Sequence, residues 1–585
     1  MSHVAAESVG APERLAAEVD TPASSPARLE SHGLAEAALP LVVFVAALGL
    51  YLSTLSKHYS EGEDSARFVI CATRPSSPAD LYQPNHLAFI TLNRLIYTFA
   101  QAAGYSGNAA IPMKAISAAA GALGLWVMLR IMRRLAVDDR LALVWAGITA
   151  VSFGYWSYST QADTYALPLP FLLLSVLIVI ELADGQFSPW QFGRLGLFNG
   201  LTILAQQMHI IIYPLMIAAA VAIWYRRRPE VRVSQLILGL MVFGAISAVI
   251  VGTAYFAVAL GPLGMRDLGS IIRWSEGQGG SGPFSPVRWF NPLVSLIAIG
   301  HAILGGHFLF GFDWFYEPFV RRFPHKLLVE ERYLALQLSE VCRLACLAAS
   351  GVAAISGLAF LSSLLFAPKK ELTGGLQSLR FFACDVIVWP ILLVSFAFNT
   401  VMEPTTIEWW VGPIPVAAIG IASLQARRPT SRRWWPAGVI FAASLFLANG
   451  AGCILPQSDL RTDYWYRVNG FLIQNARPGD TIFTDGGFVS DSYVDLYTGA
   501  NVVSVHLVRF DWLKQILARP HSGRFWISSW ALEPPAEVDR TGYFNANRSV
   551  NQDAAVNRAY LKGLSGRMVK RDESPAQQVW ELLPP

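Results

Sequence analysis

Long apolar segments recur along the chain, separated by short polar ones. A helix that crosses the hydrocarbon core of a bilayer needs about 20 mostly apolar residues. Single segments near that length cover residues 38–56, 110–132, 140–157, 163–183, 234–260, 340–366, 381–400, 409–425 and 434–453. The apolar segment 194–225 is interrupted by Gln206, Gln207 and His209, so it predicts two short helices that meet at a polar break. The pattern predicts an all-α polytopic membrane bundle of about eleven transmembrane helices over residues 38–453.

Arginines and lysines gather in alternate connections between these segments. The basic connections contain Arg130, Arg133, Arg134 and Arg140; Arg226, Arg227, Arg228 and Arg232; Lys369, Lys370 and Arg380; and Arg427, Arg428, Arg432 and Arg433. The intervening turns have no Lys or Arg: 158–162, 207–208 and 401–408. Because positive residues in short loops stay cytoplasmic, the turns without them are expected on the outer side.

This alternation predicts a cytoplasmic N-terminus, where the polar segment 1–37 is expected to be a disordered tail. It also predicts large outer loops over residues 57–109 and 261–339. The alternation requires that residues 291–311 do not cross the bilayer; that segment is aromatic and suits an interfacial or re-entrant helix, and whether it crosses is left open.

From about residue 454 to the C-terminus the composition is that of an ordinary soluble domain. Strands are expected over 481–484, 501–506 and 524–528, with helices over 491–497 and 510–518. Strands that alternate with helices predict a small three-layer α/β domain, here extracytoplasmic. The chain has no G-x-G-x-x-G and no Walker A lysine, so nucleotide binding is not expected. The Asp485-Gly-Gly487 sequence after the first strand is interpreted as a turn.

Composition agrees with a membrane protein. Of the 585 residues, 53% are hydrophobic and 15% are charged, whereas soluble domains average about 25% charged residues. The net charge of +4 gives no basis for nucleic-acid binding. Ala-rich and Arg-rich usage favours a bacterial inner membrane. The five cysteines, Cys71, Cys342, Cys346, Cys384 and Cys453, have no metal or redox spacing and are expected at helix contacts.

The first outer loop begins with the acidic sequence Glu61-Gly-Glu63-Asp64. Mutual repulsion between adjacent carboxylates separates their pKa values, which suits one of them to act as a base. Carboxylate oxygens are also ligands for a divalent cation such as Mg or Mn, which here would bind Glu63 and Asp64. A solvated acidic loop without a site is the third interpretation, and the residues alone leave all three open.

Other polar residues lie at or within the apolar segments, where ionisable groups are costly and usually functional. Asp163, followed by Tyr165, opens one segment and is either a helix N-cap or part of a site. His209 lies at the polar break, which is tolerated only where it lines a cavity or is buried in protein. Glu408 precedes two tryptophans, which indicates either an interfacial aromatic belt or a site.

Two outer regions carry candidate substrate-binding residues. Gln83-Pro-Asn-His86 begins an amphipathic stretch that is expected to lie in the plane of the outer surface. Arg273 and Arg288 lie in the second outer loop, where a guanidinium binds either a substrate phosphate or the anionic groups of lipids.

Taken in order, these motifs resemble the GT-C superfamily of polytopic glycosyltransferases, and in particular its protein O-mannosyltransferase-like branch. The resemblance covers about residues 40–453. The matching motifs are Glu63-Asp64, Gln83-Pro-Asn-His86, Asp163-Thr-Tyr165, Gly200-Leu201 with His209 and Pro214, and Glu408-Trp409-Trp410 with Pro413 and Pro415.

The resemblance implies transfer of a sugar from a polyprenyl-phosphate donor, held in the membrane lipid, to a glycan, lipid or protein acceptor at the outer face. Asp64 would be the general base or would help to hold a metal, supported by Glu63, and Asp163 would orient the acceptor or assist catalysis. His209, Arg273 and Arg288 would bind the donor phosphate. His86, Tyr165 and Glu408 would complete the substrate-binding site.

A polytopic transporter or lipid flippase is the alternative from another class, because broken helices and polar groups within spans also occur there. The clustering of carboxylates near one face favours the enzyme. A scaffold without activity would leave the acidic loop and the helix break without a role.

Overall fold

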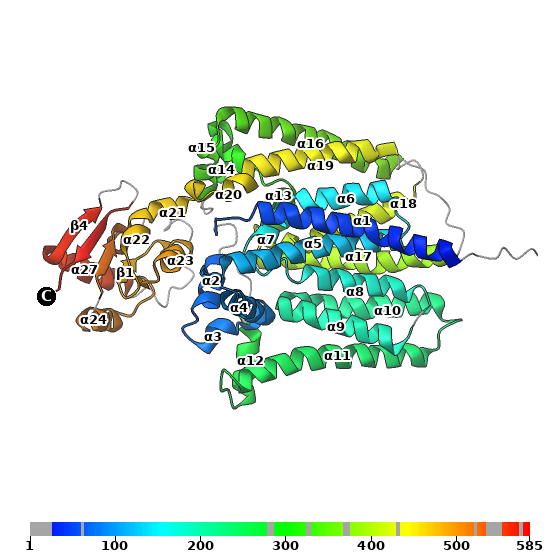
Figure 1. Ribbon diagram of the computed structural model, residues 1–585, viewed down its shortest axis with the longest axis horizontal. Coiled ribbons are helices and arrows are strands. Elements are labelled where there is room, and N and C mark those ends of the chain that lie inside the picture. Colours follow the sequence, from blue (N-terminus) through cyan, green and yellow to red (C-terminus); the bar gives the residue numbers. More distant parts are fainter. Residues whose placement is uncertain are drawn as a thin grey trace, which may run out of the picture.

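The structure, a computed structural model, describes residues 26–59, 64–185, 187–277, 286–322, 329–366, 375–428, 433–519, 523–533, 553–572 and 577–584. Long helices run roughly parallel in a bundle, and a small domain with a β-sheet lies beyond one end of it (Figure 1). The expected helical membrane bundle with a small α/β domain is therefore confirmed. Residues 1–25 of the expected disordered tail 1–37 lie outside the described residues. The expectation is wrong for residues 26–37, which belong to the first helix, α1 (Pro26–Ser53), so that this helix begins upstream of the expected start near residue 38.

Within the described residues, seven helical segments are long and apolar enough to cross a membrane. They are built on α5 (Ala110–Arg134), η2 with α10 (Gln207–Ile212, Tyr213–Arg227), α11 (Val233–Leu260), α16 (Glu340–Phe366), α17 (Leu376–Met402), η5 with α18 (Glu408–Trp410, Pro413–Ala426), and α19 with η7 and α20 (Trp435–Asn449, Gly450–Ile454, Leu455–Gln457).

The other expected spans are made of shorter helices, for two local reasons. The expected helix over 140–157 breaks at Ser152, whose extended backbone separates α6 from α7. The expected helix over 163–183 begins only at Leu169, because Pro168 and Pro170 lack the N–H groups that a helix interior needs and fit only its first turn. The shorter helices of the bundle are α6 (Asp139–Val151), α7 (Phe153–Thr160), α8 (Leu169–Leu182), α9 (Pro189–Ala205) and α13 (Asn291–Ile303).

The segment 291–311, whose crossing was left open, forms α13 and the short helix η4 (His307–Gly311). The 13 residues of α13 rise by about 20 Å, which is less than the roughly 30 Å of a bilayer core. This helix alone is therefore too short to cross.

Ion pairs bring the arginine-rich connections together at one end of the bundle. Arg134 and Arg380 both pair with Asp184, the latter with an Nε–Oδ1 distance of 2.5 Å. Arg427 pairs with Asp385 at 2.7 Å. We call this the basic end; the sheet domain lies at the opposite end (Figure 1).

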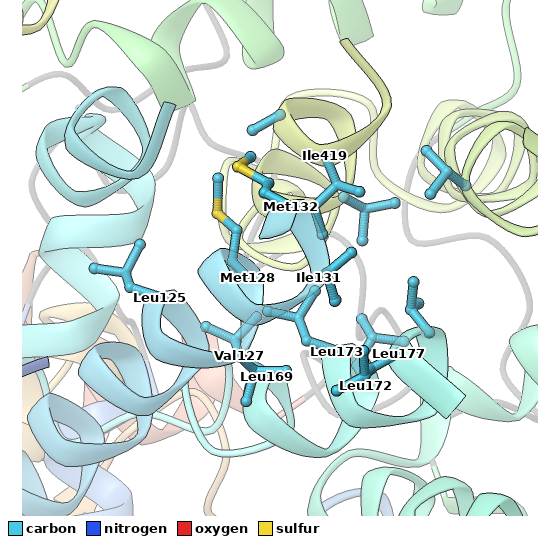
Figure 2. Packing of buried hydrophobic residues seen from close by; sticks show 14 of the residues in the cluster. Leu125, Val127, Met128, Ile131, Met132, Leu169, Leu172, Leu173, Leu177 and Ile419 are labelled. Atoms are coloured by element: carbon cyan, nitrogen blue, oxygen red, sulfur yellow. The ribbon is translucent and has the colours of Figure 1, made fainter. Parts of the chain in front are cut away.

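A continuous apolar core joins the central helices. In Figure 2, residues of α5 pack against residues of α8 and against Ile419 of α18. The residues of α5 are Leu125, Val127, Met128, Ile131 and Met132, and those of α8 are Leu169, Leu172, Leu173 and Leu177. This packing fixes α8, and with it the loop 161–168 that precedes it.

Short helices cover the bundle end that faces the sheet domain. Those between α1 and α5 are α2 (Ser65–Thr73), α3 (Pro78–Leu81), η1 (Pro84–His86) and α4 (Leu87–Ala102). Those between α11 and α16 are α12 (Leu268–Glu276), η4, α14 (Asp313–Arg322) and α15 (Val329–Gln337). The expected amphipathic helix corresponds to α4, which buries Phe89 and Ile90 and exposes Leu95 and Phe99.

The described part of the C-terminal domain contains a five-stranded sheet in the order β2-β1-β3-β5-β4. The three expected strands are confirmed as β1 (Thr481–Thr484), β2 (Asn501–Ser504) and β3 (Phe525–Ser528), which are parallel. The antiparallel strands β4 (Met568–Asp572) and β5 (Val579–Leu582) were not expected.

Helices cover both faces of this sheet, which confirms the three-layer arrangement. Neighbouring residues of a strand point to opposite faces. Ile482 packs with α22 (Gly470–Asn475) and α23 (Gly487–Thr498), and Phe483 packs with α24 (Phe510–Ala518) and α27 (Ala554–Gly563). The remaining short helices are η8 (Leu460–Thr462), α21 (Tyr464–Val468), α25 (Ser529–Leu532) and η9 (Ser565–Arg567).

Asp485, which follows β1, does more than form the expected turn. Its carboxylate is fully buried and pairs with His506 and with the Arg558 guanidinium, the latter at 2.6 Å. A buried carboxylate needs such partners because burial of an unpaired charge is costly. The pairs tie β1 to β2 and to α27.

Candidate functional site

A small cavity, partly open to solvent, lies at the helix break near the end of the bundle that faces the sheet domain. Its polar lining comes from four separate parts of the chain: the loop before α8, the η2 break, α17 and the η5 turn. The polar and aromatic residues are Tyr165, Gln206, His209, Ser395, Glu408 and Trp409, and the apolar ones are Leu172, Met208, Ile211, Ile212, Ile391, Gly412 and Pro413. A mostly apolar hollow with a few convergent polar groups is typical of a ligand site.

Glu408 is the acceptor at the centre of the polar lining. Its carboxylate accepts hydrogen bonds from Tyr165 Oη at 2.6 Å and from Tyr158 Oη at 3.4 Å. The indole Nε1 of Trp409 donates to Tyr165 Oη at 3.2 Å. Burial and the charge of Glu408 raise the pKa of Tyr165 well above its ordinary value, so the phenol stays protonated and donates.

Asp163 lies in the loop 161–168, and its side chain is buried, with 2% exposed. The helix begins only at Leu169, so Asp163 is not an N-cap, which was the structural interpretation of this residue. Its Oδ1 accepts from the Thr164 N–H at 2.6 Å, and its Oδ2 accepts from Ser65 Oγ at 3.0 Å. Burial raises its pKa to about 6.

Asp64 immediately precedes α2 and makes no capping hydrogen bond with its side chain. Solvent reaches Asp64, but the surrounding protein desolvates its carboxyl in part, and the charge of Asp163 acts in the same direction. Together they raise the pKa of Asp64 to about 6. Ser65, the next residue in the chain, hydrogen-bonds to Asp163, so Asp64 is one residue away from a contact with Asp163. Glu63, its expected partner, lies outside the described residues.

The two histidines differ in position. His209 is 7% exposed and lines the cavity, where a side-chain carbon added at Gly412 would lie 3.8 Å from its Cε1. His86 ends η1 outside the cavity lining and packs edge-on against Phe68, with 5.7 Å between ring centroids. Its Nδ1 is buried without a hydrogen-bond partner among the described residues. Burial lowers the pKa of His86 to about 4, so its ring is neutral at pH 7.

The structure does not bring Arg273 and Arg288 into the cavity lining. Both are exposed: Arg273 donates to Ser270 Oγ at 3.1 Å on α12, and Arg288 lies 5.7 Å from the ring centroid of Phe290. The helix that carries Arg273 is nevertheless tied to the helix break, because the Gln207 amide donates to the Ser275 carbonyl at 2.6 Å.

Two residues near the carboxylates were not identified from the sequence. Lys114 of α5 is buried, and its Nζ donates to the Ser56 carbonyl at 2.6 Å and lies 4.2 Å from the ring centroid of Tyr59. A lysine within an expected span was the signal that could have identified it. Ser65 links Asp163 to α2, and nothing in the sequence distinguishes it from other serines.

The described residues contain no group of three or more His, Cys, Asp or Glu side chains placed to hold a metal ion. The expected Mg or Mn site at Glu63 and Asp64 includes a residue that lies outside them.

The fold and the site define a polytopic helical membrane protein with a buried carboxylate site at one end of its bundle. No family model matches the chain, and no curated protein matches its sequence. Among solved structures it is similar to the crystal structure of ArnT from Cupriavidus metallidurans in the apo state, with 12% identity, a TM-score of 0.46, and coverage of 93% of this chain and 98% of that chain.

It is also similar to the crystal structure of ArnT from Cupriavidus metallidurans bound to undecaprenyl phosphate, with 12% identity and a TM-score of 0.43, covering 94% of this chain and 98% of that chain. At these values the similarity assigns no activity to this chain.

Proposed function

We propose that this protein is a membrane glycosyltransferase that moves a sugar from a polyprenyl-phosphate donor to an acceptor hydroxyl at the outer face, with inversion at the anomeric carbon. The observation that carries the proposal is the joint placement of Asp64, Asp163 and Glu408. Two of these carboxyls have pKa values of about 6, and the third lines a cavity between membrane helices. Perturbed acids beside a cavity are typical of catalytic sites.

Asp64 is the general base. Its carboxylate takes the proton of the acceptor hydroxyl while the acceptor oxygen attacks the anomeric carbon from the face opposite the phosphate. The bond from that carbon to the phosphate oxygen breaks, and its electron pair leaves with the polyprenyl phosphate. With a pKa of about 6, Asp64 is about nine-tenths ionised at pH 7 and still basic enough to accept the proton.

Asp163 orients the acceptor and keeps the pKa of Asp64 high, because its negative charge disfavours a second one nearby. Tyr165 and Glu408 line the cavity, and their mutual hydrogen bond fixes both side chains. The phenol of Tyr165 and the carboxyl group of Glu408 bind the substrate. Partial burial of these groups lowers the local dielectric, which strengthens their hydrogen bonds to a bound substrate.

The donor's lipid chain occupies the membrane beside the bundle, and its phosphate meets His209, Arg273 and Arg288. Cationic and hydrogen-bonding groups stabilise the charge that develops on the phosphate as it leaves. His86 contributes its unpaired Nδ1 to substrate binding. The protein O-mannosyltransferase-like branch, the bacterial inner membrane and an extracytoplasmic C-terminal domain belong to the same proposal, supported by the motif order and by the separation of the basic end from the site.

Purified protein in liposomes, given a panel of radiolabelled polyprenyl-phosphate sugars and an acceptor extract, tests the proposal. We expect sugar to leave the lipid pool with native protein and at least 100-fold more slowly with Asp64→Asn, as loss of a general base requires. If EDTA abolishes turnover and Mg or Mn restores it, Asp64 would also have the role of a metal ligand. Movement of donor across the bilayer without sugar transfer would instead identify a flippase.

A further inference from the structure

The chain that leads into the acidic loop is held by the C-terminal part of the protein. The backbone N–H groups of Lys57 and His58 donate to the Gln457 carbonyl at 2.7 and 3.3 Å. The His58 Nε2 lies 3.0 Å from the Asp459 carbonyl oxygen and 3.1 Å from Thr462 Oγ1. The segment before Asp64 is thus tied to the end of the last membrane helix and to the residues that follow it.

Tyr493 of α23 holds the last described residue before the loop. The backbone N–H of Tyr59 donates to Tyr493 Oη at 2.7 Å, and that hydroxyl donates to the Asp463 carboxylate. The two tyrosine rings meet edge-on, with 5.6 Å between centroids. All three side chains are at least 95% buried. The Tyr493 hydroxyl therefore accepts one hydrogen bond and donates another, both between buried groups.

The same helix also holds the far side of the loop. Asp495, two residues after Tyr493, pairs with Arg74 at the end of α2 at 2.6 Å. Phe68 and Val69 of α2 belong to one buried cluster with Tyr59 and Tyr493, and α2 lies beside α23 at the junction of bundle and domain (Figure 1). Residues 60–64, which end in Asp64, thus connect two segments that α23 holds in place.

We propose that Tyr493 of the C-terminal domain is a positioning residue for Asp64. This domain is then part of the catalytic site, because α23 fixes the position of the base. The inference rests on the proposed function. The Ser65–Asp163 hydrogen bond depends on the fixed position of α2, and the position of Asp64 relative to Asp163 depends on it too.

Tyr493→Phe removes the hydroxyl and leaves the ring, and Tyr497→Phe on the same helix is the matched control, since its hydroxyl has no hydrogen bond to the described residues. We expect turnover number to fall at least tenfold in Tyr493→Phe with an unchanged KM for the donor, and to stay native in Tyr497→Phe. We also expect the acid limb of the pH–rate profile, near pH 6 in the native protein, to move to lower pH, because a looser Asp64 is better hydrated and farther from Asp163.

Hydrogen exchange gives a readout that does not depend on activity. The peptides that cover residues 56–74 should exchange faster in Tyr493→Phe and not in Tyr497→Phe. If Tyr493→Phe does not fold, Asp495→Asn, which releases the other end, should show the same changes. Native exchange and native turnover in the Phe variant would overturn the positioning role while the glycosyltransferase stands. Absence of turnover by native protein would overturn the proposed function. In that case, native hydrogen exchange in Tyr493→Phe would overturn the positioning role as well.

Discussion

Replacing Asp163 by Asn is expected to stabilise the protein while it impairs catalysis. The amide has nearly the same shape as the carboxylate and keeps both local contacts. Its oxygen can accept from the Thr164 N–H, and its nitrogen can donate to Ser65 Oγ, which then acts as the acceptor. Only the proton of the Ser65 hydroxyl loses its acceptor, so the main change is the removal of a buried charge.

The magnitude follows from the pKa of Asp163, which burial raises from 3.8 to about 6. A rise of roughly two units corresponds to about 3 kcal/mol between the two protonation states. Between about pH 4 and pH 6 the folded protein keeps a proton that the unfolded chain has lost. The free energy of unfolding therefore falls as pH rises through this window, and the full cost is present at pH 8.

Asn carries no such cost, so the variant should exceed native protein in free energy of unfolding by up to about 3 kcal/mol at pH 8 and match it near pH 4. Unfolding monitored by tryptophan fluorescence in detergent at both pH values measures the difference. Asp511→Asn removes an exposed carboxylate, with 78% of its side chain accessible, and should show no pH-dependent gain. A variant less stable than native protein at pH 8 would refute the reasoning from burial.

Two further variants test the cavity and the donor site. Glu408→Gln replaces the carboxyl that accepts from Tyr165 Oη by an amide and should lower turnover number by about tenfold, because a hydrogen bond contributes up to roughly 1.5 kcal/mol. Initial rates in liposomes measure this change, and a native rate would remove Glu408 from the site. Arg273→Ala combined with Arg288→Ala should lower kcat/KM for the donor about tenfold, whereas Arg266→Ala, on the same exposed segment, should leave it unchanged. An unchanged kcat/KM in the double variant would mean that these arginines do not bind the donor.

The sequence was sufficient for those parts of the fold that depend on local patterns. Apolar length identified the membrane bundle, and turn residues with alternating strands and helices identified β1, β2 and β3. It was insufficient where tertiary packing decides. The strand β4, Met568–Asp572, contains three charged residues and an irregular register, so its pattern does not indicate a strand.

The site was predictable as a set of residues but not as a geometry. Charged or polar groups at the ends of apolar segments indicated Asp163, His209 and Glu408, because such groups are rare in membranes. The pairing of Tyr165 with Glu408 joins residues 243 positions apart, and Ser65 lies 98 positions from Asp163. No local pattern encodes these distances. The contacts of α23 with the two ends of the acidic loop depend on the docking of a whole domain. They could not be inferred from the sequence.

The role of Asp64 as the base is tested most directly by the pH dependence of kcat/KM for the donor, because this ratio reports the ionisation of the free enzyme. Native protein should lose activity on the acid side with a midpoint near pH 6, the pKa that burial and Asp163 give Asp64. Asp64→Asn should have at most one hundredth of the native value at and above pH 7, where native Asp64 is mostly ionised. A native profile that stays flat down to pH 4.5, or an Asn variant with native turnover, would contradict the role of Asp64.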